Sequence, residues 1–226
     1  SSFPNQDKIY SVTHITKIHS MIIKHIYHNI LRWYRKARIK NKEITIISNN
    51  CWGGFMYQSC GLQYNTPLIG LYFYAPEYIK LLKDLKNNIE KPIIFIPKEK
   101  SKYAHLISKD YIIGVLGDTG IEIVFMHYQT EQEVLIKWER RKKRIHWDNM
   151  LVKFSDSDSA RNEEYIHEFD KMPFANKVCF TGKAYPTCKS VIYMKEFKSQ
   201  GYAYYEWAYS YKYYNFVKQV NKIPKR

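Results

Sequence analysis

The sequence predicts an α/β protein: a single Rossmann-like three-layer domain with a mostly parallel sheet, preceded by an N-terminal amphipathic helical arm. Short β-branched runs alternate with helical patterns, which is typical of βαβ units. The 226 residues and 45% hydrophobic content suffice for one sizeable core. Because neither a repeat nor a linker divides the chain, we assign residues 1–42 to the arm and 43–226 to the α/β domain.

The arm is predicted to form a basic amphipathic helix. Between Ile15 and Arg38, apolar residues recur at helical spacing and basic residues occupy the other side. Residues 1–42 contain nine Lys and Arg and one acid, Asp7, so this region carries about half of the net charge of +15. Such a helix packs on the core or on a second copy in a homodimer, or it binds an anionic membrane surface.

The elements of the α/β domain follow from local patterns. Strands are expected over residues 44–48, 68–74, 93–96, 111–116, 121–128, 150–154 and 177–180. Helices are expected after the turn at 49–54 and over 75–88, 130–144, 160–171 and 202–220. Pro76 and Glu77 suit a first helical turn, and Thr130 with Glu133 forms a capping box. Gly117 belongs to a tight turn between two strands.

Composition excludes several classes of protein. The isoelectric point of about 9.5 favours anionic partners such as phosphate, nucleotide, nucleic acid or anionic lipid. The four cysteines show no zinc-binding spacing and are too few for a disulfide scaffold, so we expect free thiols in a reducing cytoplasm and no metal site. The longest apolar stretch, 67–76, is about half of a membrane span, and no signal peptide is recognised, which predicts a soluble or peripheral protein.

The strongest chemical signal is the segment SNNCWGG, residues 48–54, which follows the first strand and opens a helix. A helix N-terminus attracts anions and lowers the pKa of a thiol. The segment therefore fits a phosphate or carboxylate cradle, or Cys51 as a nucleophile with amide groups in an oxyanion hole. A tight turn with a buried Cys and a packed Trp is the structural alternative. The candidate binding residues here are Asn49, Asn50, Trp52, Gly53 and Gly54.

Other candidates lie at the predicted strand ends. His127 with a carboxylate could act as a base and its orienting group, and Asp156 with Asp158 could hold a cation. Each acid has a structural alternative as a turn or N-cap residue, as Asp158 would be before the helix at 160. The candidate catalytic residues are Cys51, His127, Asp118 and Asp156. Candidate substrate-binding residues outside the first segment are Trp147, Asp148 and Asn149.

Two further stretches are rich in basic or in aromatic residues. Residues 137–144 (KWERRKKR) contain six basic residues; a nucleic-acid surface is one interpretation, but cations at a helix C-terminus favour a solvated face. Residues 202–216 (YAYYEWAYSYKYYNF) could stack on sugars or bases, whereas their helical spacing favours a terminal helix that covers the core.

Several of these segments together resemble a known family. They are ISNNCWGG (47–54), PLIGLYFYAPEYIKLL (67–82), IGVLGD (113–118), HY (127–128), KWERRKKRIHWDN (137–149), VKFSD (152–156) and KVCFTGKAYP (177–186). The chain from residue 36 onward resembles a bacterial family labelled exopolysaccharide biosynthesis protein and also described as a domain of unknown function. The resemblance implies a role in capsule or lipopolysaccharide assembly, and a sugar acetyltransferase activity is ascribed to some members. It marks the candidate residues without assigning a role to any of them.

We therefore expect a transferase of surface or exopolysaccharide biosynthesis, of the sugar O-acyltransferase or glycosyltransferase type. It would act on a glycan or a lipid-linked precursor with acyl-CoA or a nucleotide sugar as donor. Acyl transfer would use Cys51 or His127, and glycosyl transfer would use Asp118 or Asp156, often with a metal. The alternative is a non-catalytic sugar-nucleotide-binding or scaffolding protein. Nucleic-acid binding rests on charge alone and is not expected. The expected location is cytoplasmic, peripheral on the inner face of the cell membrane.

Overall fold

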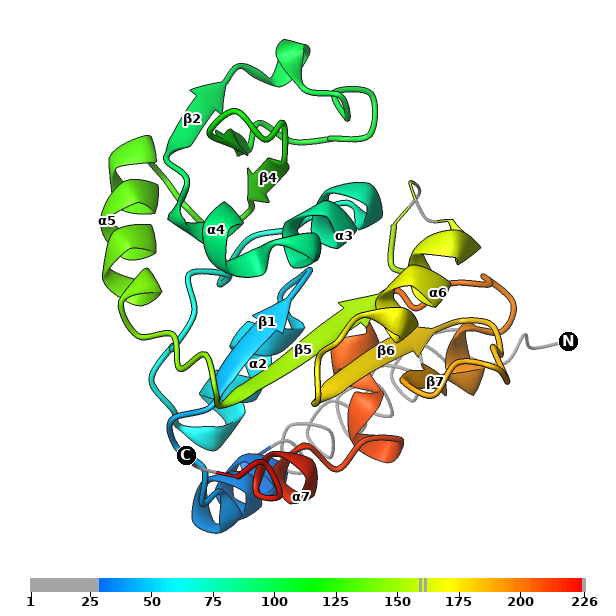
Figure 1. Ribbon diagram of the computed structural model, residues 1–226. Coiled ribbons are helices and arrows are strands. Elements are labelled where there is room, and N and C mark those ends of the chain that lie inside the picture. Colours follow the sequence, from blue (N-terminus) through cyan, green and yellow to red (C-terminus); the bar gives the residue numbers. More distant parts are fainter. Residues whose placement is uncertain (1–28, 159, 161, 225–226) are drawn as a thin grey trace, which may run out of the picture.

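The computed structural model describes residues 29–158, 160 and 162–224, and these residues form two separate sheets (Figure 1). The larger is parallel, with the order β1 (Thr45–Ser48), β5 (Met150–Ser155), β6 (Lys177–Thr181) and β7 (Val191–Tyr193). The smaller is antiparallel and comprises β2 (Ile93–Ile96), β3 (Ile112–Leu116) and β4 (Glu122–Phe125). The predicted α/β class and parallel sheet are therefore present, but three of the strands form a separate antiparallel sheet.

Helices cover both faces of the parallel sheet because the side chains of each strand alternate between them. One face, with Ile47 and Val152, packs against α3 (Ala75–Lys83), α4 (Leu85–Glu90) and α6 (Glu163–Lys171). The opposite face, with Ile46 and Leu151, packs against α2 (Trp52–Cys60) and α7 (Phe216–Val220). Figure 1 shows α3 and α6 on one side of this sheet and α7 on the other.

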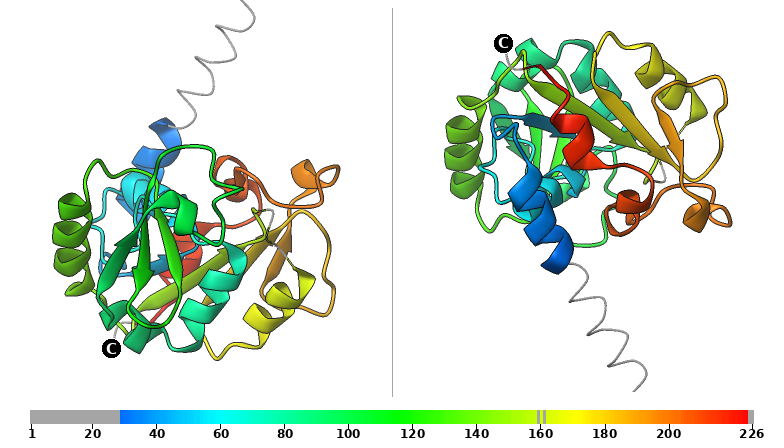
Figure 2. Two further views of the ribbon diagram at one scale, coloured as in Figure 1. Left: turned by 90° about the horizontal axis from the view of Figure 1, so that it is seen from above. Right: turned by 90° about the horizontal axis from the view of Figure 1, so that it is seen from below.

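The described end of the predicted arm is a helix over residues 29–38, which lies beside α7 (Figure 2). Just after this helix, Asn41 Nδ2 donates a hydrogen bond to the Val220 carbonyl at 3.3 Å, which joins the two ends of the described chain. The rest of the arm, 1–28, lies outside the described residues. Within the described ranges, no helix combines the length and the apolar character needed to cross a bilayer.

The small sheet is joined to the rest of the fold through α3 and α5 (Glu131–Lys142). Glu122 N–H on β4 donates to the Glu77 carboxylate on α3 at 2.9 Å. The hydroxyl of Thr130 accepts from Glu133 N–H at 3.1 Å, so Thr130 caps α5 as predicted, while the Glu133 carboxylate accepts from Gln129 N–H at 2.8 Å. Short 3-10 turns complete the described fold: η1 (Lys98–Lys100), η2 (Lys195–Phe197), η3 (Glu206–Ala208) and η4 (Ser210–Lys212).

Two predicted elements at 68–88 differ in the structure. Residues 68–74 form one isolated antiparallel bridge, Tyr72 to Val124, instead of a strand. The helix expected over 75–88 is divided into α3 and α4, because Asp84 adopts non-helical backbone angles (φ −142°).

The expected helix over 202–220 is also wrong: it is replaced by η3 and η4, with α7 alone at its end. Tyr205 has a left-handed backbone (φ 58°), which a right-handed helix cannot contain. Asp158 does not cap the next helix, which begins at Glu163 with Asn162 as its N-cap. Instead, its carboxylate accepts the Ala75 N–H at the start of α3, at 2.9 Å.

Candidate functional site

A buried polar network lies at the ends of β1 and β5, where the two parallel strands finish together. Lys153 is fully buried, and its ammonium group contacts the Glu206 carboxylate. Lys153 Nζ also donates to Asn50 Oδ1 at 2.9 Å and to Ser155 Oγ at 3.1 Å. Burial lowers the pKa of Lys153, and the Glu206 carboxylate opposes that shift.

The network joins the first predicted motif to the C-terminal turns. Asn50 Nδ2 donates to Glu206 Oε1 at 2.7 Å, across a separation of 156 residues. Its Oδ1 accepts from Trp52 N–H at 3.1 Å, which satisfies a backbone donor at the start of α2. Because the Asn50 amide is already bonded to protein groups on both sides, it positions the loop and the beginning of α2.

Other residues of the SNNCWGG segment also have structural contacts. Asn49 Nδ2 donates to the Ser155 carbonyl at 3.1 Å, and its Oδ1 accepts from Ser155 N–H at 3.2 Å. Trp52 is fully buried and donates from Nε1 to Ser210 Oγ at 3.0 Å. A Cβ on Gly53 would lie 3.2 Å from atoms of the Ile46 and Ser48 side chains, so glycine allows α2 to approach β1 closely.

A cavity of about 380 Å³ lies beside α2 and brings two of the predicted catalytic residues together. Cys51 and His127 both line it, from the loop after β1 and the segment after β4. The other lining residues are Gly54, Phe55, Gln58, Tyr64, Ile69, Gly70, Tyr128, Lys137 and Arg141. Its volume lies near the lower end of the range for small-molecule sites, about 300–1,000 Å³.

Two cations on α5 give this cavity its charge. Arg141 is only 7% exposed; it donates to the Tyr128 hydroxyl at 2.8 Å and lies 5.0 Å from the centre of the Tyr64 ring. Among the described residues, no carboxylate lies within 4.0 Å of its guanidinium group. Lys137, one helical turn earlier, is paired with Glu133. The cavity therefore contains a largely buried cation with no described carboxylate in direct contact. The Glu133 carboxyl lies within electrostatic reach: its pKa is lowered mainly by the Gln129 N–H and Lys137, and also by Arg141.

Cys51 lies between this cavity and the buried network. Burial raises the pKa of its thiol, the Glu206 carboxylate raises it further, and the Lys153 ammonium group lowers it. The first two effects prevail, so at neutral pH the side chain is a thiol and not a thiolate. A covalent step at Cys51 would therefore need a base that removes its proton.

The two predicted catalytic carboxylates lie outside the cavity. Asp118 is in the β3–β4 turn with its side chain 84% exposed, and its hydrogen bond to Lys91 lowers its pKa. Asp156 is buried after β5 and accepts from Ala203 N–H at 2.7 Å and Gly182 N–H at 3.3 Å. Asp156 thus fixes neighbouring loops. Over the described ranges, no three His, Cys, Asp or Glu side chains are placed to hold a metal ion.

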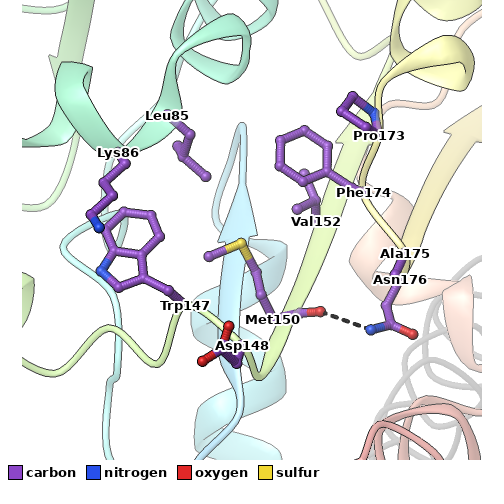
Figure 3. A pocket seen from close by; sticks show the side chains of 10 residues that line it. All are labelled: Leu85, Lys86, Trp147, Asp148, Met150, Val152, Pro173, Phe174, Ala175 and Asn176. Atoms are coloured by element: carbon purple, nitrogen blue, oxygen red, sulfur yellow. Dashed lines mark hydrogen bonds between the residues drawn. The ribbon is translucent and has the colours of Figure 1, made fainter.

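The remaining candidates lie at the opposite edge of the parallel sheet, where β5 begins. Trp147 and Asp148 line a second cavity of about 320 Å³, between α4 and the chain that leads into β6 (Figure 3). The Lys86 ammonium group lies 5.9 Å from the centre of the Trp147 ring. Asn149 is buried and exchanges two amide hydrogen bonds with Asn41, at 2.7 and 2.9 Å. These three residues therefore do not meet Cys51 and His127.

Neither Arg141 nor Lys153 was predicted individually from the sequence. Arg141 belongs to the run expected to form a solvated face, yet it follows Val134 and Trp138 at helical spacing and is buried with them. That spacing could have identified it. Lys153 interrupts a mostly apolar strand that is buried from Leu151 to Ser155, and such a charge needs a partner, but only the folded chain brings Glu206 to it.

These features define an α/β protein with a cation-lined cavity beside a parallel sheet. The chain belongs to the family described as domain of unknown function DUF1919, whose pattern matches residues 22–223. It is also similar to a protein of Haemophilus influenzae described as an uncharacterized protein, with 36% identity over 165 residues that cover 73% of this chain and 74% of that protein. Because neither description names a reaction, a proposal about function depends on the residues themselves.

Proposed function

We propose that this protein is a transferase of surface or exopolysaccharide biosynthesis, and that the cavity beside α2 binds the phosphate-bearing part of its donor. Acyl-CoA and nucleotide sugars both carry such phosphates. Support for the biological setting comes from the motifs that resemble exopolysaccharide biosynthesis proteins. Support for the ligand class comes from the cavity.

Arg141 is the observation that carries this proposal. A cation buried away from water is costly unless an anion or several hydrogen bonds compensate it. Arg141 is only 7% exposed, and the two groups that it contacts, the Tyr128 hydroxyl and the Tyr64 ring, carry no formal charge. A phosphate in the cavity would place an anion in direct contact with the guanidinium group and match its fork of donors.

Acyl transfer fits the cavity better than carboxylate-dependent glycosyl transfer, because His127 and Cys51 line it while Asp118 and Asp156 do not. In the direct reaction, His127 takes the proton from a sugar hydroxyl as its oxygen attacks the thioester carbonyl of the donor. The carbon–sulfur bond breaks, and the departing CoA sulfur takes the proton from His127. Cys51 would lie beside the reacting groups as a thiol.

A non-catalytic sugar-nucleotide-binding or scaffolding protein is the second candidate. The raised pKa of Cys51 favours it, because a ready nucleophile would have a lowered pKa. In that case the cavity would bind its ligand without turnover.

The proposed function involves both the α/β domain and the N-terminal arm. We place residues 43–226 in one Rossmann-like three-layer domain and residues 1–42 in a basic arm that holds the protein at the inner face of the cell membrane. The helix over residues 29–38 supports this role, because Trp33 and Ile30 are 74% and 58% exposed among basic residues. The protein would then be cytoplasmic and peripheral.

Calorimetric titration with CoA, acetyl-CoA and UDP-glucose tests the ligand class, with Arg141→Met as the key variant. Arg140→Met is the matched control, because Arg140 is the exposed neighbour on the same helix. Hydrogen bonds to charged groups contribute about 1.5–3 kcal/mol, so Arg141→Met should weaken binding about 10- to 150-fold. Arg140→Met should bind like the wild type.

Absence of binding by all three compounds, or equal affinity in the two variants, would refute the assignment of the cavity. Turnover is measured separately by release of free CoA in the presence of glycan. His127→Ala should keep donor binding and lose turnover. Donor binding without turnover in the wild type would instead support the binding or scaffolding role.

A further inference from the structure

Three aromatic rings of the C-terminal turns and one ring of α2 are exposed next to the cavity and contact one another in sequence. We call Phe55, Trp207, Tyr205 and Tyr204 the aromatic strip. Successive ring centres in this order are 4.8, 5.5 and 4.0 Å apart, and their planes differ by 38°, 85° and 53°. The side chains are 37–52% exposed, so the strip is a stepped apolar surface open to solvent.

Buried polar contacts hold the strip in place. Glu206 lies between Tyr205 and Trp207 in the sequence and points inward to the Lys153 ammonium group. Ser210, one turn further, accepts the indole N–H of Trp52 at 3.0 Å. Because these anchors fix the backbone between the rings, less of the chain has to be ordered when a ligand binds.

Tyr205 also has an unusual backbone conformation. Its φ of 58° is the left-handed region, which Asn and Gly tolerate and a bulky side chain does not favour. A strained conformation that persists at an exposed ring indicates that the ring has a use at that position.

The chemistry of the strip favours an uncharged, hydroxyl-rich ligand. Residues 202–210 contain no Lys or Arg, whereas surfaces for anionic membranes and for nucleic acids combine aromatic rings with cations. A sugar ring presents a face of C–H groups that packs on the negative face of an aromatic ring, and a rim of hydroxyls that can bond to Tyr hydroxyls.

The strip is continuous with the cavity. Phe55 is a residue of both: it lines the cavity with Cys51 and Gly54, and its ring contacts Trp207. We propose that the aromatic strip binds a neutral glycan chain and presents its end to the cavity. The role of acceptor for this glycan rests on the proposed transferase function, whereas the binding itself does not.

Saturation-transfer NMR tests the binding without any donor. The probes are malto-, cello-, manno- and N-acetylchito-hexaose, since stacking on aromatic rings tolerates different sugars and the method detects weak complexes. Trp207→Ala should weaken binding at least tenfold. Trp33→Ala, which removes an exposed indole from the helix over residues 29–38, is the matched control and should leave it unchanged.

Tyr205→Asn separates ligand binding from folding. Because Asn tolerates a positive φ, this variant should unfold at the same or a higher temperature than the wild type while its affinity for glycan falls. A lower melting temperature with unchanged glycan binding would overturn the proposal. Absence of a saturation-transfer signal for all four oligosaccharides, or equal binding by wild type and Trp207→Ala, would also overturn the proposal.

Vesicles of phosphatidylcholine, with and without phosphatidylglycerol, test whether the strip binds a membrane instead of a glycan. If Trp207→Ala abolishes vesicle binding and spares oligosaccharide binding, the strip is a membrane surface and the proposal fails. Donor titration distinguishes this failure from failure of the proposed function, because the Arg141 variants report on the cavity alone.

Discussion

Lys153→Met is expected to destabilise the fold strongly, because it leaves the Glu206 carboxylate buried without its cation. Glu206 would retain two neutral donors, the Asn50 amide at 2.7 Å and the Ser155 hydroxyl at 3.3 Å. Removing one member of a buried ion pair costs about 3–5 kcal/mol. In a protein of 226 residues each kcal/mol lowers the melting temperature by about 2–4 °C, so a loss of about 6–20 °C is expected.

Urea unfolding followed by circular dichroism measures this free energy in a double-mutant cycle. Glu206→Gln alone should be costly for the reciprocal reason, since it leaves Lys153 buried and unpaired. The double variant removes both charges and should lose less than the sum of the single losses, by about 2 kcal/mol or more. Lys212→Met is the surface control: its pair with Glu196 is 44% and 23% exposed, and its loss should cost less than about 1 kcal/mol.

Two results would contradict this expectation. One is a Lys153→Met variant that loses no more stability than the surface control. The other is a double variant whose loss equals the sum of the two single losses. Either result would mean that the ammonium and carboxylate groups do not depend on each other in the folded protein. The carboxylate would then be satisfied by its neutral donors.

Three more predictions concern individual residues. Iodoacetamide should modify Cys51 more slowly than a free cysteine at neutral pH, and the rate should keep rising above pH 9.0 because the pKa is raised; a plateau at lower pH would contradict this. Gly182→Ala should lower stability by about 1–3 kcal/mol in urea unfolding, since a Cβ would lie 2.2 Å from Tyr202 N; unchanged stability would be inconsistent with this backbone contact. Asn149→Ala should cost about 1–3 kcal/mol, because the Asn41 Oδ1 loses its donor and Asn41 Nδ2 keeps only the Val220 carbonyl, while calorimetry shows unchanged donor binding; weaker donor binding would show that Asn149 belongs to the site.

Local patterns predicted much of the fold. The alternation of strands and helices predicted a mixed α/β protein, and Thr130 with Glu133 predicted the start of α5, because both depend on neighbours in the sequence. Division into two sheets was not predictable in this way. The apolar run from 68 to 74 was expected to be a strand, but it forms a single bridge, from Tyr72 to Val124, and bonds through Phe73 N–H to the Asn49 carbonyl after β1.

The candidate site was predictable only in part. Cys51 was chosen because it follows a predicted strand and His127 because it lies at the end of one, and the structure places both at one cavity. Arg141 was interpreted as part of a solvated face, because the basic residues around it were given more weight than its helical spacing from buried residues. Glu206 could not be identified as the partner of Lys153, because 53 residues separate them and no local pattern records that contact.

The contact between Asn50 and Glu206 has a consequence for synthesis on the ribosome. The two side chains are 156 residues apart in the sequence. At a synthesis rate of about 5–20 residues per second, Glu206 is therefore added roughly 8–31 s after Asn50. During that interval β1 and β5 can pair, but Lys153 has no counter-charge. A nascent chain that stops before residue 206 would therefore expose this lysine to water or to chaperones, and folding would be completed only when the last turns emerge.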